Sequence, residues 1–73
     1  MPPKHDLAAR LKTARLKAGM TQEGLARAAK LNQSRVSSYE TGTEPSVDVL
    51  RRLCRALGVS ADELLGLPRR SET

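Results

Sequence analysis

The chain has 73 residues, enough for one small domain that removes only roughly 60% of its unfolded surface from water. Its single cysteine excludes an intrachain disulfide, no Cys and His residues stand at metal-ligand spacing, and the apolar runs are too short to span a membrane. Residues 1–6 lead into an amphipathic pattern and lack the apolar segment of a signal peptide. The sequence therefore predicts a cytoplasmic protein without metal or other cofactor, for which self-association is the remaining source of stability.

The positive charge is concentrated in the first half of the chain. The net charge is +5. Residues 1–40 hold eight Lys and Arg against three Asp and Glu, whereas residues 41–73 hold five of each. A surface that binds a polyanion needs a local excess of this kind, although many helical domains are mildly basic.

The first predicted helix follows a Pro-containing arm of residues 1–5, which we expect to be flexible. Asp6 is a suitable N-cap, and Gly19 supplies the positive φ that ends a helix cheaply. The apolar side chains recur at helical spacing: Leu7, Leu11, Ala14 and Ala18. Leu16 lies off this stripe, so it is either singly exposed or a contact with another subunit or with the C-terminal segment.

A second helix is predicted after Thr21, a good N-cap. Its inward side chains are Leu25, Ala26 and Ala29. Gly24 occupies the third helical position, at a cost of up to about 1 kcal/mol in helix propensity. Close approach of a backbone or a phosphate would explain this glycine, and neutral drift explains it equally well. A tight turn then leads to Asn32, the predicted N-cap of a third helix.

The third helix has an outer face that a core does not need. At about 100° per residue, one side carries Val36, Tyr39 and Glu40, and Gln33 lies at the N-terminal tip. The opposite side presents short polar groups: Ser34, Ser38 and Thr41, flanked by Arg35 and Ser37. A solvated face would ordinarily hold Glu and Lys. This pattern favours a helix-turn-helix motif made of the second and third predicted helices, of which the third enters the major groove of DNA.

Two further helices complete the pattern. Gly42 ends the third helix, and Ser46 caps a fourth. The fourth helix has a buried stripe of Val49 or Leu50, Leu53, Cys54 and Leu57, with Arg51, Arg52 and Arg55 on its other face. Gly58 ends it. The segment Ser60-Ala61-Asp62-Glu63 is a complete capping box for a short fifth helix.

The chain lacks the residues that catalysis needs. His5 is the only histidine and lies in the arm, no phosphate-binding loop is present, and Ser37 and Ser38 have no base to activate them. Cys54 lies on an apolar stripe, as a small core hydrophobe does. Because Tyr39 is the only aromatic residue and is assigned to the core, stacking on single-stranded nucleic acid is also disfavoured. Duplex DNA remains.

Motifs at fixed spacing occupy residues 11–65: Arg15 four residues before Gly19, Thr21-Gln22, Leu25-Ala26, Val36-Ser37, Glu40, Gly42, Pro45-Ser46, and Ala56-Leu57-Gly58-Val59 with Leu64. Each is common alone, but together they resemble the phage repressor and Cro family of helix-turn-helix regulators, the Xre-like class. The resemblance implies an all-α, compact five-helix bundle, a lambda-repressor-like DNA-binding domain. We assign residues 6–67 to this domain and expect a disordered tail over residues 68–73.

The resemblance also implies residues that meet DNA: base contacts from Gln33, Ser34 and Ser38 of the recognition helix, and a phosphate contact from Gln22. Beside these, Ser37 flanks the base-contacting face. Further phosphate contacts are expected from Thr21, Arg35 and Thr43. The loop of residues 41–46 holds Glu44 and no Lys or Arg, so a hydroxyl such as that of Thr43 would have to supply its contacts. For Arg35 a guanine, a phosphate or solvent stay open, and we favour phosphate.

Two further features follow from the comparison with the family pattern. Arg15 and Glu40 match a buried ion pair that joins the first helix to the end of the third. Lys30 stands where glycine commonly turns the chain. Either Lys30 adopts a positive φ at a cost of about 1–2 kcal/mol, or the turn differs.

These features favour a sequence-specific regulator that binds double-stranded DNA as a homodimer on a palindromic operator. The expected dimer patch comprises Val59, Leu64, Leu65 and Leu67, unless Val59 and Leu64 belong to the core. A protein-interaction module such as an antitoxin, with a protein partner, is the main rival. A second rival function is the nonspecific coating of DNA.

Overall fold

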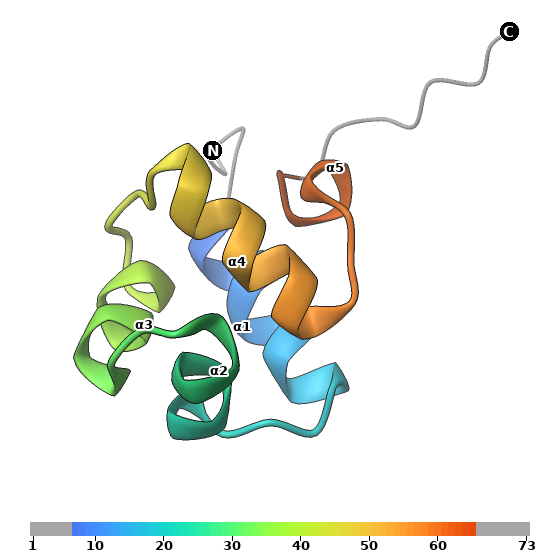
Figure 1. The fold of residues 1–73 in the computed structure, drawn as a ribbon. Helices are drawn as coiled ribbons and strands as arrows, with labels where there is room; N and C mark the ends of the chain where they lie inside the picture. The colour runs from blue at the N-terminus through green and yellow to red at the C-terminus, as the bar shows by residue number, and fades with distance from the viewer. Residues whose placement is uncertain (1–6, 66–73) are drawn as a thin grey trace, which may run out of the picture.

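The computed structural model describes residues 7–65, which form five helices and no strand. They are α1 (Leu7–Lys17), α2 (Gln22–Ala29), α3 (Gln33–Glu40), α4 (Val47–Leu57) and α5 (Ala61–Leu65), as Figure 1 shows. The predicted all-α five-helix bundle is therefore confirmed. The expectations for residues 1–5, Asp6, Leu67 and residues 68–73 lie outside the described residues.

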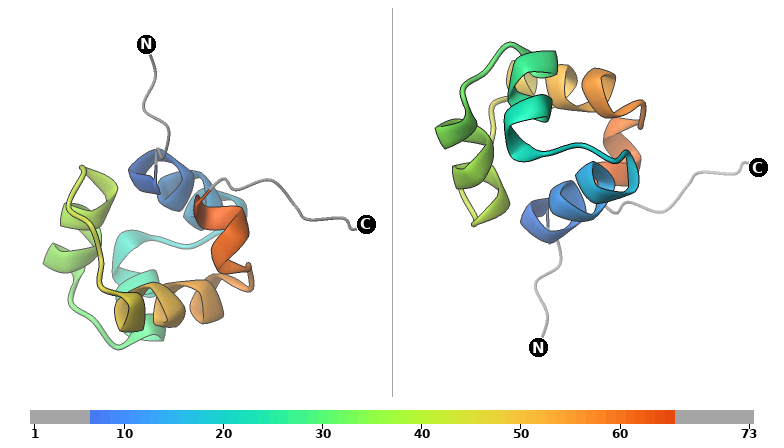
Figure 2. Two further views of the ribbon diagram at one scale, coloured as in Figure 1. Left: turned by 90° about the horizontal axis from the view of Figure 1, so that it is seen from above. Right: turned by 90° about the horizontal axis from the view of Figure 1, so that it is seen from below.

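The helices surround one core. α2 packs against α3 and α4, while α1 packs against α3 and α5. Seen from above, α1 and α4 lie on opposite sides of the bundle, with α3 and α5 at its two ends (Figure 2). Because α3 lies at an edge, one of its faces covers the core and the other is free to meet a partner.

Side-chain caps determine where the helices begin. Oxygens of Thr21, Asn32 and Ser46 accept the backbone N–H three residues later, at 2.9, 2.9 and 3.2 Å. At α5 the Ser60 hydroxyl accepts the N–H of Glu63 at 3.1 Å, and the Glu63 carboxylate accepts the N–H of Ser60 at 3.0 Å. The caps predicted at Thr21, Asn32, Ser46 and Ser60 are confirmed, each contributing about 0.5–2 kcal/mol, and the one predicted at Asp6 lies outside the described residues.

The core draws on every helix. Its buried side chains are Leu11, Leu25, Ala26, Ala29, Val36, Tyr39, Val49, Leu53, Cys54 and Leu64. Each large aliphatic side chain contributes about 1.5–3 kcal/mol on burial. Of the two alternatives for α4, Val49 is buried, while Leu50 is partly buried against the cluster. The placement of Ala18 on the stripe of the first helix was wrong, because α1 ends at Lys17 and Ala18 is exposed beyond it.

Gly24 lies against the cap of its own helix. A Cβ atom at this position would lie 3.2 Å from the Oγ1 atom of Thr21 and within 4 Å of no other group. The cap does not require glycine, because Arg35, Val49 and Glu63 carry side chains at the same position beneath the caps of α3, α4 and α5. Within residues 7–65, close approach of another backbone does not account for Gly24.

Lys30 forms the turn between α2 and α3 in the left-handed conformation, with φ 61° and ψ 47°. Its N–H group contacts the carbonyls of Ala26 and Arg27 at the end of α2, and the N–H of Leu31 reaches the carbonyl of Ala26 at 2.7 Å. The turn thus keeps the geometry that glycine would give. Lysine holds it at the steric cost of a Cβ atom.

Replacing Lys30 with glycine should therefore stabilise the protein. We expect Lys30→Gly to raise the free energy of unfolding by about 0.5–1 kcal/mol, since relief of strain outweighs the added chain entropy. Urea denaturation followed by circular dichroism measures this. Lys12→Gly, in the middle of α1, is the matched control and should destabilise by about 1 kcal/mol. If the urea midpoint of Lys30→Gly were at or below that of the wild type, the left-handed conformation of Lys30 would not be strained.

Candidate nucleic-acid interface

The outer face of α3 is polar and accessible. Ser34, Ser38, Thr41 and Gln33 are exposed, and Ser37 is half-buried. Val36 and Tyr39 hold the helix from beneath, at 0% and 5% exposure. The structure therefore presents the small hydroxyl groups outward, where they can approach a partner without displacing core side chains.

Arg15 and Glu40 form an ion pair across the bundle. The Nε atom of Arg15 lies 2.7 Å from Oε2 of Glu40, and its Nη2 atom lies 3.2 Å from Oε1. Only 9% and 3% of the two side chains remain exposed. Nη1 of Arg15 also donates to the carbonyl of Met20 at 2.9 Å. The pair thus joins α1, the segment before α2 and the last residue of α3 at a single point.

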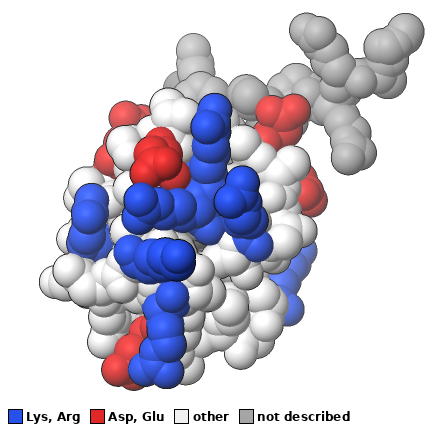
Figure 3. Space-filling model, viewed as in Figure 1, with Lys and Arg blue, Asp and Glu red and all other residues white. Residues whose placement is uncertain are grey.

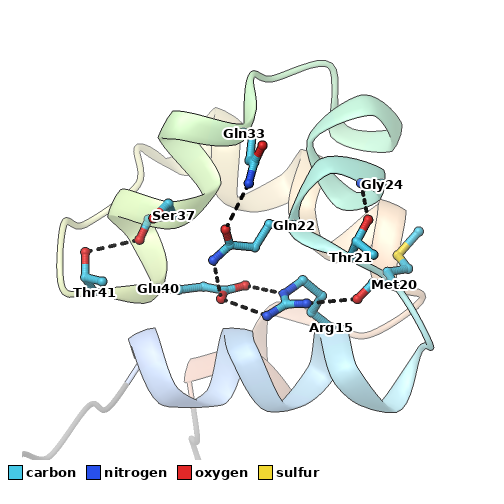
Figure 4. Close-up of polar contacts among 9 residues, drawn as sticks. All are labelled: Arg15, Met20, Thr21, Gln22, Gly24, Gln33, Ser37, Glu40 and Thr41. Atoms are coloured by element: carbon cyan, nitrogen blue, oxygen red, sulfur yellow. Dashed lines mark hydrogen bonds and ion pairs between the residues drawn. The ribbon is translucent and has the colours of Figure 1, made fainter.

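The ion pair continues into a chain of amides. Nε2 of Gln22, the first residue of α2, donates to Oε1 of Glu40 at 3.1 Å. Oε1 of Gln22 accepts from Nε2 of Gln33, the first residue of α3, at 3.5 Å. Figure 4 shows the chain running from the interior of the bundle to the tip of α3. Gln33 is thus linked to Glu40 through Gln22, and the exposed contact of 3.5 Å between the two glutamines is the longest in the chain.

The link through Gln22 is a feature that sequence reasoning missed. From the resemblance, Gln22 was expected to hold a phosphate of the DNA backbone at the start of the second helix. In the structure both ends of its amide are engaged, which leaves one N–H and one carbonyl lone pair for a ligand. Three long polar side chains at helix ends, Gln22, Gln33 and Glu40, were the available signal. Their convergence depends on how α2 packs on α3.

The other expected phosphate-contacting residues lie around the same face. Arg35 and Thr43 border a shallow hollow of about 380 Å³ together with Asn32, Ser34, Ser38 and Tyr39. Thr21 is exposed, but its hydroxyl already caps α2. Thr41 donates its hydroxyl to the carbonyls of Ser37 and Ser38 at 3.1 and 3.0 Å, so this side chain closes the end of α3.

Positive charge also gathers on α4. Figure 3 shows Lys and Arg side chains over the face that α4 occupies in Figure 1. Arg51, Arg52 and Arg55 are exposed there, with Asp48 paired to Arg52 at 3.1 Å. Counting charges by halves of the chain hid this face, because the count included acidic residues that fall outside α4 in the sequence, and because Asp48 pairs with Arg52. Helical spacing had indicated it.

The residues expected at a dimer contact divide between core and surface. Leu64 is only 2% exposed and Val59 packs against the core, as the alternative interpretation had it. Leu65 is half-buried. A groove of about 470 Å³ runs between α1 and α5, with Leu57, Val59 and Leu64 among its lining residues. Leu16, on α1, is 58% exposed.

Nothing within residues 7–65 resembles a metal or membrane site. No group of three or more His, Cys, Asp or Glu side chains comes together there, and no helix in this range has the length and apolarity to cross a bilayer. Cys54 is buried; its burial, and secondarily the negative charge of Glu63, raise the pKa of its thiol. The thiol is therefore less ionised at neutral pH than a free cysteine, consistent with a core side chain.

The capped pair α2 and α3, the tight turn between them and the outward polar face define a helix-turn-helix domain. The sequence model of the helix-turn-helix family matches residues 11–64. The HTH-type transcriptional regulator ImmR of Bacillus subtilis (strain 168) is 41% identical over 61 residues, 82% of this chain and 48% of that protein. The chain thus spans about half the length of this curated relative.

Solved structures agree with the match. The restriction-modification controller protein C.AhdI from Aeromonas hydrophila superposes with a TM-score of 0.78 at 32% identity, covering 81% of this chain and 91% of that one. The P22 c2 repressor protein, solved in complex with a synthetic operator, gives 0.75 at 30% identity with the same coverage. The chain belongs to the helix-turn-helix family of Xre/Cro-like transcriptional regulators.

Removing one partner of the buried pair should be costly. We expect Glu40→Ala to lower the free energy of unfolding by about 3–5 kcal/mol, because the guanidinium of Arg15 is left buried without its counter-charge. Urea denaturation with a structural readout measures the loss. Glu44→Ala removes an exposed carboxylate from the next loop and should change stability by no more than about 0.5 kcal/mol. If Glu40→Ala and Glu44→Ala had equal midpoints of urea denaturation, the ion pair would contribute nothing to the free energy of unfolding.

Proposed function

We propose that this domain is a sequence-specific regulator that binds double-stranded DNA with α3 in the major groove. The observation that carries the proposal is the hydrogen-bonded chain that links the buried Glu40 to Gln33 at the exposed tip of α3. A side chain that is both exposed and oriented is suited to reading a base edge. The P22 c2 repressor, of the same fold, is seen bound to an operator.

Gln33 is the principal base reader in this proposal. Its amide offers a donor and an acceptor, the pair that an adenine needs in the major groove. Ser34 and Ser38, one turn apart, supply shorter hydroxyls that donate or accept without strong discrimination. Ser37 is half-buried on the flank that carries Gln33, so we give it a secondary contact. A good bidentate contact discriminates by about 1–3 kcal/mol.

Backbone contacts position the helix in the groove. The free N–H groups at the start of α2 attract phosphate, and Gln22, with one N–H left over, can reach the same strand. Arg35 and Thr43 serve the phosphates beside the hollow on the other flank of α3. The basic face of α4 adds a longer-range positive field.

A homodimer would place two copies of α3 about 34 Å apart, one turn of DNA, and so match a palindromic operator. The α1–α5 groove supports this proposal. Its walls carry Arg10 and Lys17 on α1 and Glu63 on α5, so a two-fold contact could pair opposite charges around an apolar floor. Leu65, the last residue of α5, would supply a half-buried apolar contact, while the buried Leu64 supports it from beneath.

Selection of bound duplexes from a random DNA pool tests the function. We expect enrichment of a palindrome whose half-sites are separated by about one helical turn. Binding of the purified protein to that duplex should weaken steeply with salt. Recovery of no preferred sequence, together with capture of a protein partner, would favour an interaction module such as an antitoxin. Salt-dependent binding without preference would indicate coating of DNA.

Gln33 and Gln22 should not divide simply into one residue that contacts a base and one that contacts a phosphate. Gln33→Ala should relax preference at one base pair per half-site by about 1–3 kcal/mol. Gln22→Ala should weaken binding to all duplexes and also reduce preference at that same base pair, because Gln33 loses its contact with Gln22. Fluorescence anisotropy against single-base variants of the selected duplex measures both effects. If Gln22→Ala kept the full preference of the wild type at that base pair, Gln33 would not need its contact with Gln22 to read the base.

A further inference from the structure

Arg35 is fixed in place by a residue that sequence analysis assigned only to the core. Nη2 of Arg35 donates to the hydroxyl oxygen of Tyr39, one turn later on α3, at 3.0 Å. The guanidinium carbon lies 5.9 Å from the centre of the Tyr39 ring, within the range of a cation–π contact. Tyr39 is itself 5% exposed and packed in the core. A rigid phenol therefore holds a surface cation.

The held position separates Arg35 from Gln33, the principal base reader in the proposed function. At about 100° per residue, Arg35 leaves the helix on the flank away from Gln33 and Ser37, with Ser34 and Ser38 between the two flanks. Arg35 lines the hollow together with Asn32, Ser34, Ser38, Tyr39 and Thr43. The lining groups are hydroxyls, an amide and one cation, and no carboxylate is among them. Such a set favours an oxyanion over a base edge.

We propose that Tyr39 is a positioning residue that preorganises Arg35, with Thr43, as a seat for one phosphate of the DNA backbone. This inference rests on the proposed function. A free arginine must give up many rotamers when it binds, whereas Arg35 is already restrained by the phenol. Tyr39 also borders the hollow, but its hydroxyl accepts from Arg35, and its positioning role is exerted through the guanidinium.

A double-mutant cycle between the two residues tests the inference. Tyr39→Phe removes one hydroxyl and keeps the ring in the core, while Arg35→Ala removes the cation. Both, and the combined variant, are titrated with the selected duplex and with a scrambled duplex between about 50 and 300 mM KCl. Lys12→Ala, an exposed cation on α1, is the control for loss of net charge.

We expect Arg35→Ala to weaken binding to both duplexes about tenfold and to reduce the salt slope by about 1. Tyr39→Phe should weaken binding about threefold to tenfold with its preference between the duplexes unchanged, and should have no further effect once Arg35 is alanine. Lys12→Ala should match the wild type.

The outcomes distinguish the inference from the function on which it rests. If the wild type does not prefer the selected duplex, the proposed function fails. If the wild type is selective but Tyr39→Phe binds as tightly as the wild type, or adds its full effect to Arg35→Ala, the positioning role is overturned. Loss of preference at one base pair in Arg35→Ala would assign Arg35 to a base and overturn the phosphate seat.

Discussion

Arg15 and Glu40 bring opposite charges into a part of the bundle where only 9% and 3% of their side chains remain exposed. Removing two charges from water is expensive, and their mutual attraction offsets that cost only when the geometry is good. Here it is bidentate, and Nη1 of the guanidinium also donates to the carbonyl of Met20. Since an apolar pair would hold the helices at least as well, we attribute the pair to geometry and not to net stability.

That geometry extends to the surface. Glu40 orients Gln22, and Gln22 orients Gln33 at the start of α3. On the other flank, Tyr39 restrains Arg35. Tyr39 is buried, and Gln22 is half-buried and held in turn by the buried carboxylate of Glu40. The outer face of α3 therefore has hydrogen-bonded support at two points. Preorganisation of this kind lowers the entropy lost on binding.

The sequence predicted what depends on local chemistry. The caps at Thr21, Asn32, Ser46 and Ser60 follow from hydroxyl and amide side chains before periodic segments, and all four are present. What it could not predict depends on how helices pack. The engagement of Gln22 by Glu40 crosses from α2 to α3 and has no periodic signature. The contact between Arg35 and Tyr39 lies within one helix, at positions i and i+4, but whether it forms depends on the side-chain rotamers. Because Tyr39 was assigned to the core, its hydroxyl was not considered as a hydrogen-bond partner.

One variant tests the central role of the buried pair most directly. Replacing both partners, with Arg15→Met and Glu40→Leu together, removes the charges without leaving either one unpaired, so the folded protein should be as stable as the wild type or more so. The ratio of its affinities for the selected and scrambled duplexes is the measurement. We predict that this ratio falls about tenfold or more, because Gln22 and through it Gln33 lose their anchor. An unchanged ratio in a folded double variant would contradict the dependence of the reading face on the ion pair.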